Sequence, residues 1–401
     1  MQNHFIIDLL GIKDKHVDVW SIHNEPSELQ VKLFTNVKKQ MCTHCKKKTK
    51  RVHGYRMQKI QGPILSTKPV IIYLRKRRYK CTQCNHTFFE RLQLVDHYQR
   101  CTNSLQTTAL TYAATGSFTT AAQLAGITTN RLLRLFDKRR VKTKKVLPRT
   151  IAIDEFKGDA GGERFQTVIA DVENKEIVEI LPDRKVDTIK EYLRSCDTSN
   201  VRIVVMDLSK SFKQAVRKVL ADPLIIADRF HFMRQVYWAL DAIRREVQHD
   251  LDKEERIRMK RSKKLLWKSV YKLSEEEKEK VNELLGVHPR LQKAYELKNL
   301  LDKWFKESDG TSAKQGLEEC LGAMNASGME VFQKVAKTFK NWKTEILQSF
   351  MYRFNNGYIE GINNTIKVLK RESYGIKSFN RLRSKILWRQ EVRNVLLQHS
   401  S

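Results

Sequence analysis

The sequence predicts a multi-domain α/β protein in which a mixed β-sheet is interrupted by a long helical segment. Three observations lead to this fold class. Two Cys-x-x-Cys pairs stand in strand-like sequence near the start, closely spaced strands alternate with helices in the middle, and continuous charged helices follow. Apolar residues make up 41% of the 401 positions, which is enough to build hydrophobic cores and excludes a wholly disordered chain.

The charge balance favours a polyanionic partner. Lysine and arginine outnumber aspartate and glutamate by 76 to 45, giving a formal charge of +31. Nucleic acid is the first candidate and an anionic membrane the second. No apolar run approaches the roughly 20 residues of a membrane helix, and the first residues do not look like a signal peptide. Seven cysteines in such a chain argue against a disulfide framework, so we expect a cytoplasmic protein.

The chain divides into five predicted segments. Residues 1–100 read as a β-module with short strands at "HVDVWSI", "ELQVKLF" and "PVIIYLRKRRYKC". Residues 101–147 read as a helical DNA-binding domain and a basic linker, and 148–231 alternate strands with helices. Residues 232–354 are continuously helical, and 355–401 form a last helical segment. The helices of 232–354 would therefore split a core that the last segment completes.

The segment 148–231 carries the element order of a ribonuclease-H-like core. "RTIAIDEF", "FQTVIADV" and "EIVEIL" read as three closely spaced strands. "KVDTIKEYLRSC" and "SKSFKQAVRKVL" read as helices that alternate with the strands "VRIVVMDL" and "PLIIADRF". Three strands followed by alternating helices and strands fit a mixed sheet with helices on its faces.

Four cysteines have the spacing of a zinc site. The pairs "CTHC" and "CTQC" each place two thiolates on one tight turn, and two such turns complete a tetrahedral site. The sequence predicts a zinc ribbon with one structural Zn²⁺, and reduced cysteines without a metal are the alternative. His44 and His86 stand beside the pairs and could replace a ligand, although we expect neither to do so. The predicted ligands are Cys42, Cys45, Cys81 and Cys84.

The stretch "FTTAAQLAGITTNRLLRLFDKRR" has the pattern of a helix-turn-helix. Ala122 stands four residues before Gly126, which can adopt the turn, and both allow the two helices to approach closely. Leu132 and Leu135 are expected on the buried face of the second helix. A plain helical hairpin is the alternative. Facing the major groove or its phosphates would be Thr128, Thr129, Asn130, Arg131 and Arg134.

The run "YLRKRRYK" places a dense basic cluster between two tyrosines. It can be a solvated strand face or an edge that contacts phosphates, and its position beside a zinc module favours the second interpretation. The predicted DNA-contacting residues are Arg75, Lys76, Arg77 and Arg78.

Two aspartates lie in strands that would be neighbours in the predicted core. Asp154 follows the strand sequence "TIAI", and Asp207 follows the strand sequence "VRIVVM". Because these strands lie side by side in such a sheet, the two carboxylates can share a cation. Hard divalent ions prefer oxygen ligands, and two such ions can stabilise the attacking and leaving oxygens of a phosphoryl transfer.

A third carboxylate is needed from another element, and Glu360 is the best candidate. Its helix, "NNGYIEGINNTIKVLKR", also carries Asn364, Lys367 and Arg371 at helical spacing on one face, so an acid and DNA contacts would point the same way. Lys370 is expected to neutralise phosphates with them.

Three further residues flank these acids. Glu155 follows Asp154 but should point to the opposite face of the sheet, because side chains alternate along a strand. Asp228 and His231, in "IIADRFHF", end the next strand. They either support the site by positioning a phosphate or a water, or make an ordinary strand-end hydrogen bond.

Together these motifs resemble the DDE transposases of bacterial insertion sequences, of the ISL-three type. The resemblance covers nearly the whole chain. "CTHC…CTQC" is similar to the family's zinc ribbon, "RMQKIQ" and "LRKRRYKC" to its basic strands, and "LVDHYQR" to the approach to its helix-turn-helix. "IAIDEF", "VVMDLSKSF", "IIADRFHF" and "YIEGINNTIKVLKRESYGIKSF" are similar to the blocks around its catalytic acids. The catalytic triad that the resemblance implies is Asp154, Asp207 and Glu360.

The resemblance implies an enzyme that cuts the ends of its element and joins the 3′ ends to target DNA, using two Mg²⁺ or Mn²⁺ ions. Asp154 would bridge both ions, and Asp207 and Glu360 would hold one each. Its partners would be terminal inverted repeats, target DNA and further copies of the chain, as a homodimer or higher oligomer on the nucleoid. A non-catalytic DNA-binding regulator and a ribonuclease-H-like nuclease are the alternatives.

Overall fold

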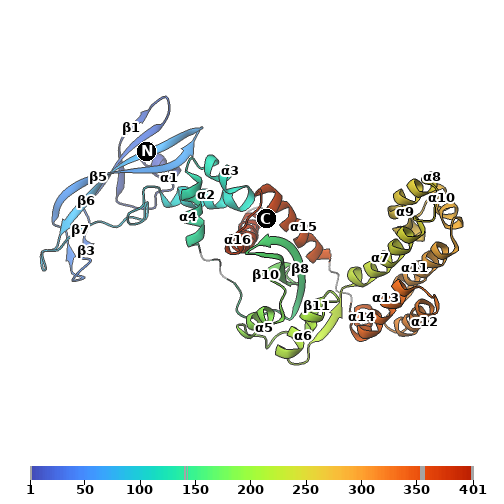
Figure 1. Ribbon diagram of the computed structural model, residues 1–401. Coiled ribbons are helices and arrows are strands. Elements are labelled where there is room, and N and C mark those ends of the chain that lie inside the picture. Colours follow the sequence, from blue (N-terminus) through green and yellow to red (C-terminus); the bar gives the residue numbers. More distant parts are fainter. Residues whose placement is uncertain (1, 140, 142, 353–356, 399–401) are drawn as a thin grey trace. The chain divides into compact units, whose positions relative to one another are not determined.

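The computed structural model describes residues 2–139, 141, 143–352 and 357–398 (Figure 1). The chain forms two compact units. The first unit consists of Met1–Val141, Lys367–Ile376 and Asn380–Ser401, and the second of Lys142–Ile366 and Lys377–Phe379. The sequence assigned all of 355–401 to the core, whereas the structure divides this segment between the two units.

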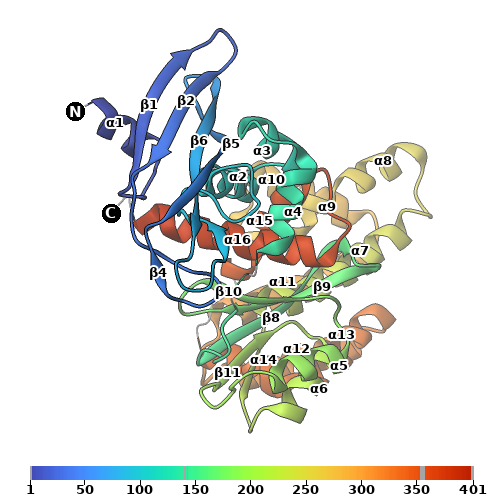
Figure 2. The same cartoon turned by 90° about the vertical axis from the view of Figure 1, so that its left-hand side faces the viewer.

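The first unit contains a sheet in the order β1-β2-β6-β5 (Figure 2). Strand β7 also pairs with β6. The pair β2–β6 is parallel and the other pairs are antiparallel. One face packs on α1 (Gln2–Leu9) and the segment Leu92–Val95. The strands are β1 (Val17–Asn24), β2 (Leu29–Thr35), β5 (Val52–Leu65), β6 (Lys68–Lys80) and β7 (Thr87–Phe89), with a separate pair β3 (Gln40–Met41) and β4 (Lys48–Thr49).

Three short helices follow in the same unit: α2 (Asn103–Thr115), α3 (Phe118–Leu124) and α4 (Thr129–Lys138). Gly126 adopts a φ of +65° between the last two, which is the turn conformation that the sequence predicted. Leu132 is buried as expected, but the second buried residue of α4 is Phe136, and Leu135 is only half-buried. Helical spacing of four residues, rather than three, sets this face.

The carboxy-terminal helix α16 (Phe379–Gln398) packs against these three helices. Trp388 Nε1 donates a hydrogen bond to the Leu110 carbonyl at 2.7 Å, and Arg381 makes two bonds to the Asp137 carboxylate at 2.7 and 2.8 Å. The buried Lys385 bonds the carbonyl of Gly116, which ends α2. The sequence did not predict this packing, because the partners are far apart along the chain.

The second unit contains a mixed five-stranded sheet in the order β10-β9-β8-β11-β12. β8 pairs antiparallel with β9 and parallel with β11, and β11 pairs parallel with β12. The sequence predicted all five strands and the two helices between them. Their bounds are β8 (Thr150–Ala160), β9 (Glu163–Asp171), β10 (Glu176–Leu181), α5 (Val186–Arg194), β11 (Ile203–Met206), α6 (Lys210–Val219) and β12 (Leu224–Ala227).

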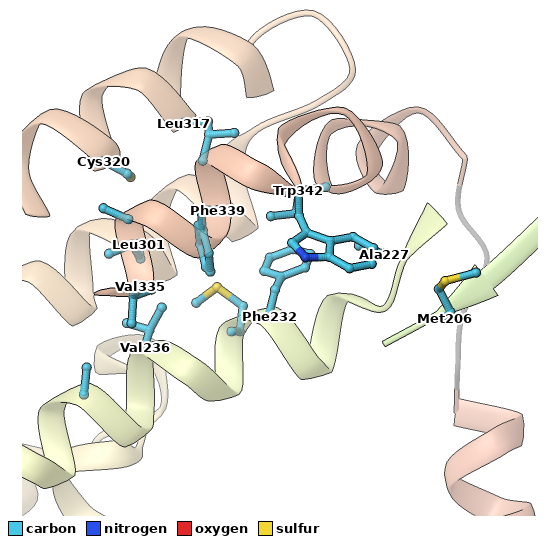
Figure 3. Close-up of a cluster of buried hydrophobic side chains, with 14 of the residues drawn as sticks. Met206, Ala227, Phe232, Val236, Leu301, Leu317, Cys320, Val335, Phe339 and Trp342 are labelled. Atoms are coloured by element: carbon cyan, nitrogen blue, oxygen red, sulfur yellow. The ribbon is translucent and has the colours of Figure 1, made fainter. Parts of the chain in front are cut away.

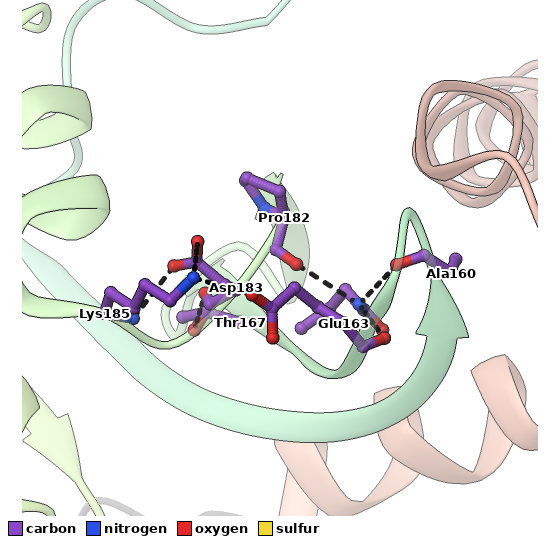
Figure 4. A network of polar contacts seen from close by, with 7 residues as sticks. Ala160, Glu163, Thr167, Pro182, Asp183 and Lys185 are labelled. Atoms are coloured by element: carbon purple, nitrogen blue, oxygen red, sulfur yellow. Dashed lines mark hydrogen bonds and ion pairs between the residues drawn. The ribbon is translucent and has the colours of Figure 1, made fainter.

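Polar contacts join the loops at one end of this sheet, where Ala160, Glu163 and Pro182 lie close together (Figure 4). Gln166 Nε2 donates to the carbonyls of Ala160 and Glu163 at 3.0 Å and of Pro182 at 3.2 Å. Gly158 makes room for it, since a Cβ there would lie 1.7 Å from Gln166 Oε1. The β8–β9 turn is therefore tied to the segment that follows β10.

The predicted helical segment begins with α7, directly after β12, and shares one hydrophobic core with the sheet. Phe232 lies in this core, and its ring centroid is 5.7 Å from that of Phe339 (Figure 3). The centroid of the Trp304 ring is 6.2 Å away. Among the described helices, none is long and apolar enough to cross a membrane. The segment contains α7 (Arg229–Val247), α8 (Lys253–Arg261), α9 (Lys263–Trp267), the 3₁₀ turn Val270–Lys272, α10 (Glu275–Gly286), α11 (Pro289–Glu307), α12 (Ala313–Ala326), α13 (Glu330–Asn341) and α14 (Lys343–Met351).

Removing the Phe232 ring should destabilise the second unit. We expect Phe232→Ala to lower the free energy of unfolding by about 3–5 kcal/mol, because the fully buried ring leaves a cavity. Urea denaturation followed by circular dichroism measures this loss. The neighbouring Phe230 is 56% exposed, so Phe230→Ala should cost about 1 kcal/mol or less. Equal losses of unfolding free energy in the two variants would contradict the role of the buried Phe232 ring in this core.

Candidate active site, metal centre and nucleic-acid interface

Three aspartates stand at the same level of the second unit's sheet. Ile153 of β8 pairs with Met206 of β11, and Met206 pairs with Ala227 of β12. The residues that follow these three are Asp154, Asp207 and Asp228. Parallel pairing thus places one carboxylate on each of three adjacent strands.

The pleat sends all three carboxylates to the same face. Ile153, Met206 and Ala227 point into the hydrophobic core, so the aspartates after them point to the other side of the sheet. Glu155, one residue further, turns back and makes an ion pair with Arg184 at 2.6 Å. The register of β8 with β9, which pairs Glu155 with Thr167, agrees with the opposite orientation that the sequence predicted for Glu155.

Burial makes the charged forms of Asp154 and Asp207 costly. Asp154 is only 5% exposed, and burial raises its pKa. Burial, and then the charge of Asp154, raises the pKa of Asp207 to about 6. Asp207 Oδ1 is buried and has no hydrogen-bond partner among the described residues. Two interacting acids with an unpaired oxygen have the donor chemistry that a hard cation requires.

Asp154 is held by its neighbours. Its Oδ1 accepts the Glu155 backbone N–H at 2.7 Å, and its Oδ2 accepts Asn363 Nδ2 at 2.8 Å. Asn363 lies on α15 (Gly357–Glu372). The sequence analysis named Asn364 and missed Asn363, although the pair "NN" stands one helical turn after Glu360.

Glu360 itself is exposed, three residues before Asn363 on α15. The structure does not bring its carboxylate into one tight ligand group with Asp154 and Asp207. Such a tight group has three or more potential metal ligands whose atoms lie within 4.8 Å of one another. Among the described residues, the group that meets this condition consists of the four cysteines. The contact of Asn363 nevertheless brings this helix to the acidic face of the sheet.

Asp228 and His231 are joined directly to each other. Asp228 begins α7 as its N-cap and accepts the Phe230 backbone N–H at 3.1 Å, and its other oxygen bonds His231 Nδ1. Burial lowers the His231 pKa, but the hydrogen bond and charge of Asp228 outweigh burial and raise it. Asp154 also acts on His231, so both predicted supporting residues lie in the electrostatic field of the acids.

The four predicted zinc ligands come together in the first unit. Cys42 Sγ lies 3.6 Å from Cys84 Sγ, and Cys45 Sγ lies 3.5 Å from Cys81 Sγ. Backbone N–H groups of Cys84 and Gln83 lower the pKa of Cys81 to about 6, which favours the thiolate. This cluster is the donor set of a structural zinc ion.

The turns after the cysteine pairs have the backbone that such a site needs. Lys46 and Asn85 each follow a pair and adopt φ values of +60° and +57°. Asparagine tolerates this left-handed conformation better than most residues. The rings of His44 and His86 lie 5.7 Å apart beside the cluster, and neither belongs to the ligand group found among the described residues.

The predicted recognition residues lie at the start of α4. Thr128 caps this helix by accepting the Arg131 backbone N–H, while Asn130 and Arg134 are exposed. Thr129 and Arg131 are half-buried, and the Arg131 guanidinium interacts with the Cys101 thiol. Thr128, Asn130 and Arg134 are thus the exposed residues of the five.

The basic residues of β6 alternate between its two faces. Arg75 and Arg77 are half-buried on one face, and Lys76 is 9% exposed on the other. Burial lowers the pKa of Lys76. Arg78 is exposed and bonds Thr87 Oγ1 at 2.8 Å. The four cations therefore do not form one continuous edge, because a strand sends neighbouring side chains to opposite sides.

On α15 the exposed side chains share one face, as the sequence predicted. Glu360, Asn364, Lys367 and Arg371 are all exposed, whereas Lys370 is half-buried. The buried face of the helix carries Ile359, Ile362, Ile366 and Leu369.

Sequence comparisons give the class of this fold. Residues 151–386 match a family profile described as transposase, and residues 38–84 match the zinc-finger of transposase IS204/IS1001/IS1096/IS1165. Residues 90–140 match the helix-turn-helix domain of transposase family ISL3. The chain therefore belongs to the ISL3 family of insertion-sequence transposases, and its activity is DNA transposition by DDE chemistry.

Curated relatives agree with this assignment. The transposase for insertion sequence element IS1001 of Bordetella parapertussis is 24% identical over 364 residues, covering 87% of this chain and 88% of the relative. The transposase for IS1557 of Mycobacterium tuberculosis is 24% identical over 57% of each chain. A Lactococcus lactis protein named ATP-dependent protease is 34% identical, but over 27% of this chain.

Replacement of one of the four cysteine ligands should abolish metal binding. We expect Cys84→Ser to lower the zinc content of the purified chain from about one ion to near zero, because three thiolates leave the tetrahedral site incomplete. Mass spectrometry of the metal content after gel filtration measures this. Cys196 lies outside the cluster, and Cys196→Ser should retain the ion. Retention by both variants would refute the four-cysteine site.

The crowded acids should cost stability at neutral pH in the absence of divalent ions. The folded state holds the Asp207 proton more tightly than the unfolded state, so the cost is absent at low pH and grows as pH rises towards about 6. We expect Asp207→Asn to gain about 1–3 kcal/mol over wild type at pH 7.5 in EDTA and less at pH 5. Urea denaturation at both pH values measures the gain. Glu191→Gln, on an exposed side chain, is the control, and a pH-independent gain would contradict the electrostatic cause.

Proposed function

We propose that the second unit has a ribonuclease-H-like core with Asp154, Asp207 and Glu360 as its catalytic triad. The strand order β10-β9-β8-β11-β12 supports this core. The observation that carries the proposal is the register of β8 and β11, which puts Asp154 and Asp207 side by side on one face. The hydrogen bond from Asn363 to Asp154 supports Glu360 as the third acid, since both side chains belong to one turn of α15.

These carboxylates would hold two Mg²⁺ or Mn²⁺ ions. The donor set fits, because it offers oxygen ligands, an unpaired buried oxygen on Asp207 and mutual repulsion that a cation relieves. When bound, such ions lower the pKa of water and stabilise the charge on a leaving oxygen. Asn363 orients Asp154, and the Asp228–His231 pair can position a phosphate or a water nearby. Lys367, Lys370 and Arg371 would neutralise phosphates.

The reaction that this arrangement supports is cleavage at the ends of the element, followed by attack of the freed 3′ hydroxyl on target DNA. Duplex binding at the terminal inverted repeats would use the exposed residues of α4 and β6. Bringing two element ends together favours more than one copy of the chain, so it would act as a homodimer or higher oligomer on DNA. It would work in the cytoplasm, on the nucleoid.

An excision assay tests the triad. A marker flanked by the gene's native neighbouring DNA is placed on a plasmid, and its loss or relocation is counted. We expect Asp207→Ala and Glu360→Ala to reduce movement by about a thousandfold or more, as for other catalytic groups that act as a unit. Glu155→Gln changes an adjacent acid on the opposite face and should retain activity.

Binding of each variant to the flanking DNA is measured in parallel by gel shift. Lost movement with retained binding supports catalytic roles. Equal movement by wild type and Asp207→Ala would refute the triad. Tight binding without movement by the wild type would favour a regulator, and hydrolysis without joining would favour a nuclease.

A further inference from the structure

The sheet of the first unit has one buried face and one open face. Val31, Leu33, Ile72 and Leu74 point into the hydrophobic core. Because side chains alternate, the residues between them in β2 and β6 point to the other side. That open face is neither the zinc cluster nor the helix-turn-helix.

Strand register arranges the open face in rows across the sheet. On the open face of β6, Tyr73, Arg75 and Arg77 each have a partner in β5, and Tyr73 and Arg75 also have one in β2. The rows are Lys32–Tyr73–Lys59, Phe34–Arg75–Met57 and Arg77–Tyr55. Trp20 of β1 joins them, with its ring 6.5 Å from that of Phe34 and 5.7 Å from the Arg75 guanidinium. We call this set the stacking face.

Cations and aromatic rings alternate on the stacking face. The Arg75 guanidinium lies 3.9 Å from the centroid of the Tyr55 ring, and Lys59 Nζ lies 5.7 Å from that of Tyr73. Trp20, Tyr55 and Met57 are 59%, 49% and 51% exposed. Large apolar side chains gathered on one exposed surface are typical of a binding site rather than of a solvated face.

We propose that the stacking face binds an unpaired DNA strand. Its lysines and arginines attract phosphates, and Asp18, which pairs with Phe34, is the one carboxylate in these rows among the described residues. Asp18 stands at the edge, where its carboxylate accepts the Val19 backbone N–H at 2.8 Å. Exposed rings and guanidinium planes offer stacking surfaces, which bases use only when they are not already stacked in a duplex.

The binding partner fits the transposition reaction but does not depend on the proposed triad. Cutting and joining strands at an element end produces unpaired segments beside the duplex that α4 would hold. A face that stacks such bases would keep a cut strand on the protein. Failure of the triad assignment would leave this binding unchanged, and the reverse is also true.

Fluorescence anisotropy on the full-length protein tests the proposal. The probes are a labelled oligothymidylate and a blunt mixed-sequence duplex, each about 20 nucleotides long. We expect the double variant Trp20→Leu/Tyr55→Leu to lose about tenfold or more in affinity for the single strand, because leucine retains bulk without a stacking surface. Affinity for the duplex should change less than about twofold.

Two controls make the result specific. Trp20→Phe/Tyr55→Phe retains the rings and should retain single-strand binding. Tyr98→Leu removes an 89% exposed ring elsewhere in the unit and should have no effect. Unchanged single-strand binding in the Leu variant would overturn the proposal, and so would an equal loss for both probes.

Photo-crosslinking of the wild-type protein needs no substitution and covers the case in which the Leu variant does not fold. An oligothymidylate carrying 5-iodouracil should crosslink to peptides that contain Trp20 or Tyr55. Crosslinks found only in other peptides would overturn the proposal.

Discussion

The parallel pairing of β8, β11 and β12 fixes the positions of the acids in the second unit. Three hydrogen-bonded strands end in register, so three aspartates stand in a row although they are distant in sequence. The register is fixed by the residues before them, since a slip of one position would turn Ile153 and Met206 out of the core. Hydrophobic packing on one face thereby positions acids on the other.

The long helical segment packs on the face of the sheet opposite the three aspartates. Its helices extend the core that receives Ile153, Met206 and Ala227, and α7 starts at Asp228 itself. The acids cannot move apart without disturbing this packing, so their repulsion is retained in the folded state and appears as the raised pKa of Asp207. A rigid support that keeps like charges together is a requirement for a site that takes up cations.

The sheet of the first unit is small and has an exposed face, so other contacts help to stabilise this unit. Four cysteines close one end of it, and α16, from the other end of the chain, packs on the helix-turn-helix through Trp388 and Lys385. The buried Lys385 places its charge at the carbonyl end of α2, where a helix favours a cation. The DNA-binding helices are thus joined to the helix that follows α15 in the sequence.

Features that depend on local spacing could be read from the sequence: the two cysteine turns, the turn at Gly126 and the five core strands. The contacts between residues far apart in the chain could not be read in this way. Asn363 reaches Asp154 over 209 positions, Phe136 rather than Leu135 is buried, and Lys76 is withdrawn from solvent. The reason is physical: local patterns fix where a side chain points on its own element, whereas contacts depend on how separate elements rotate and pack.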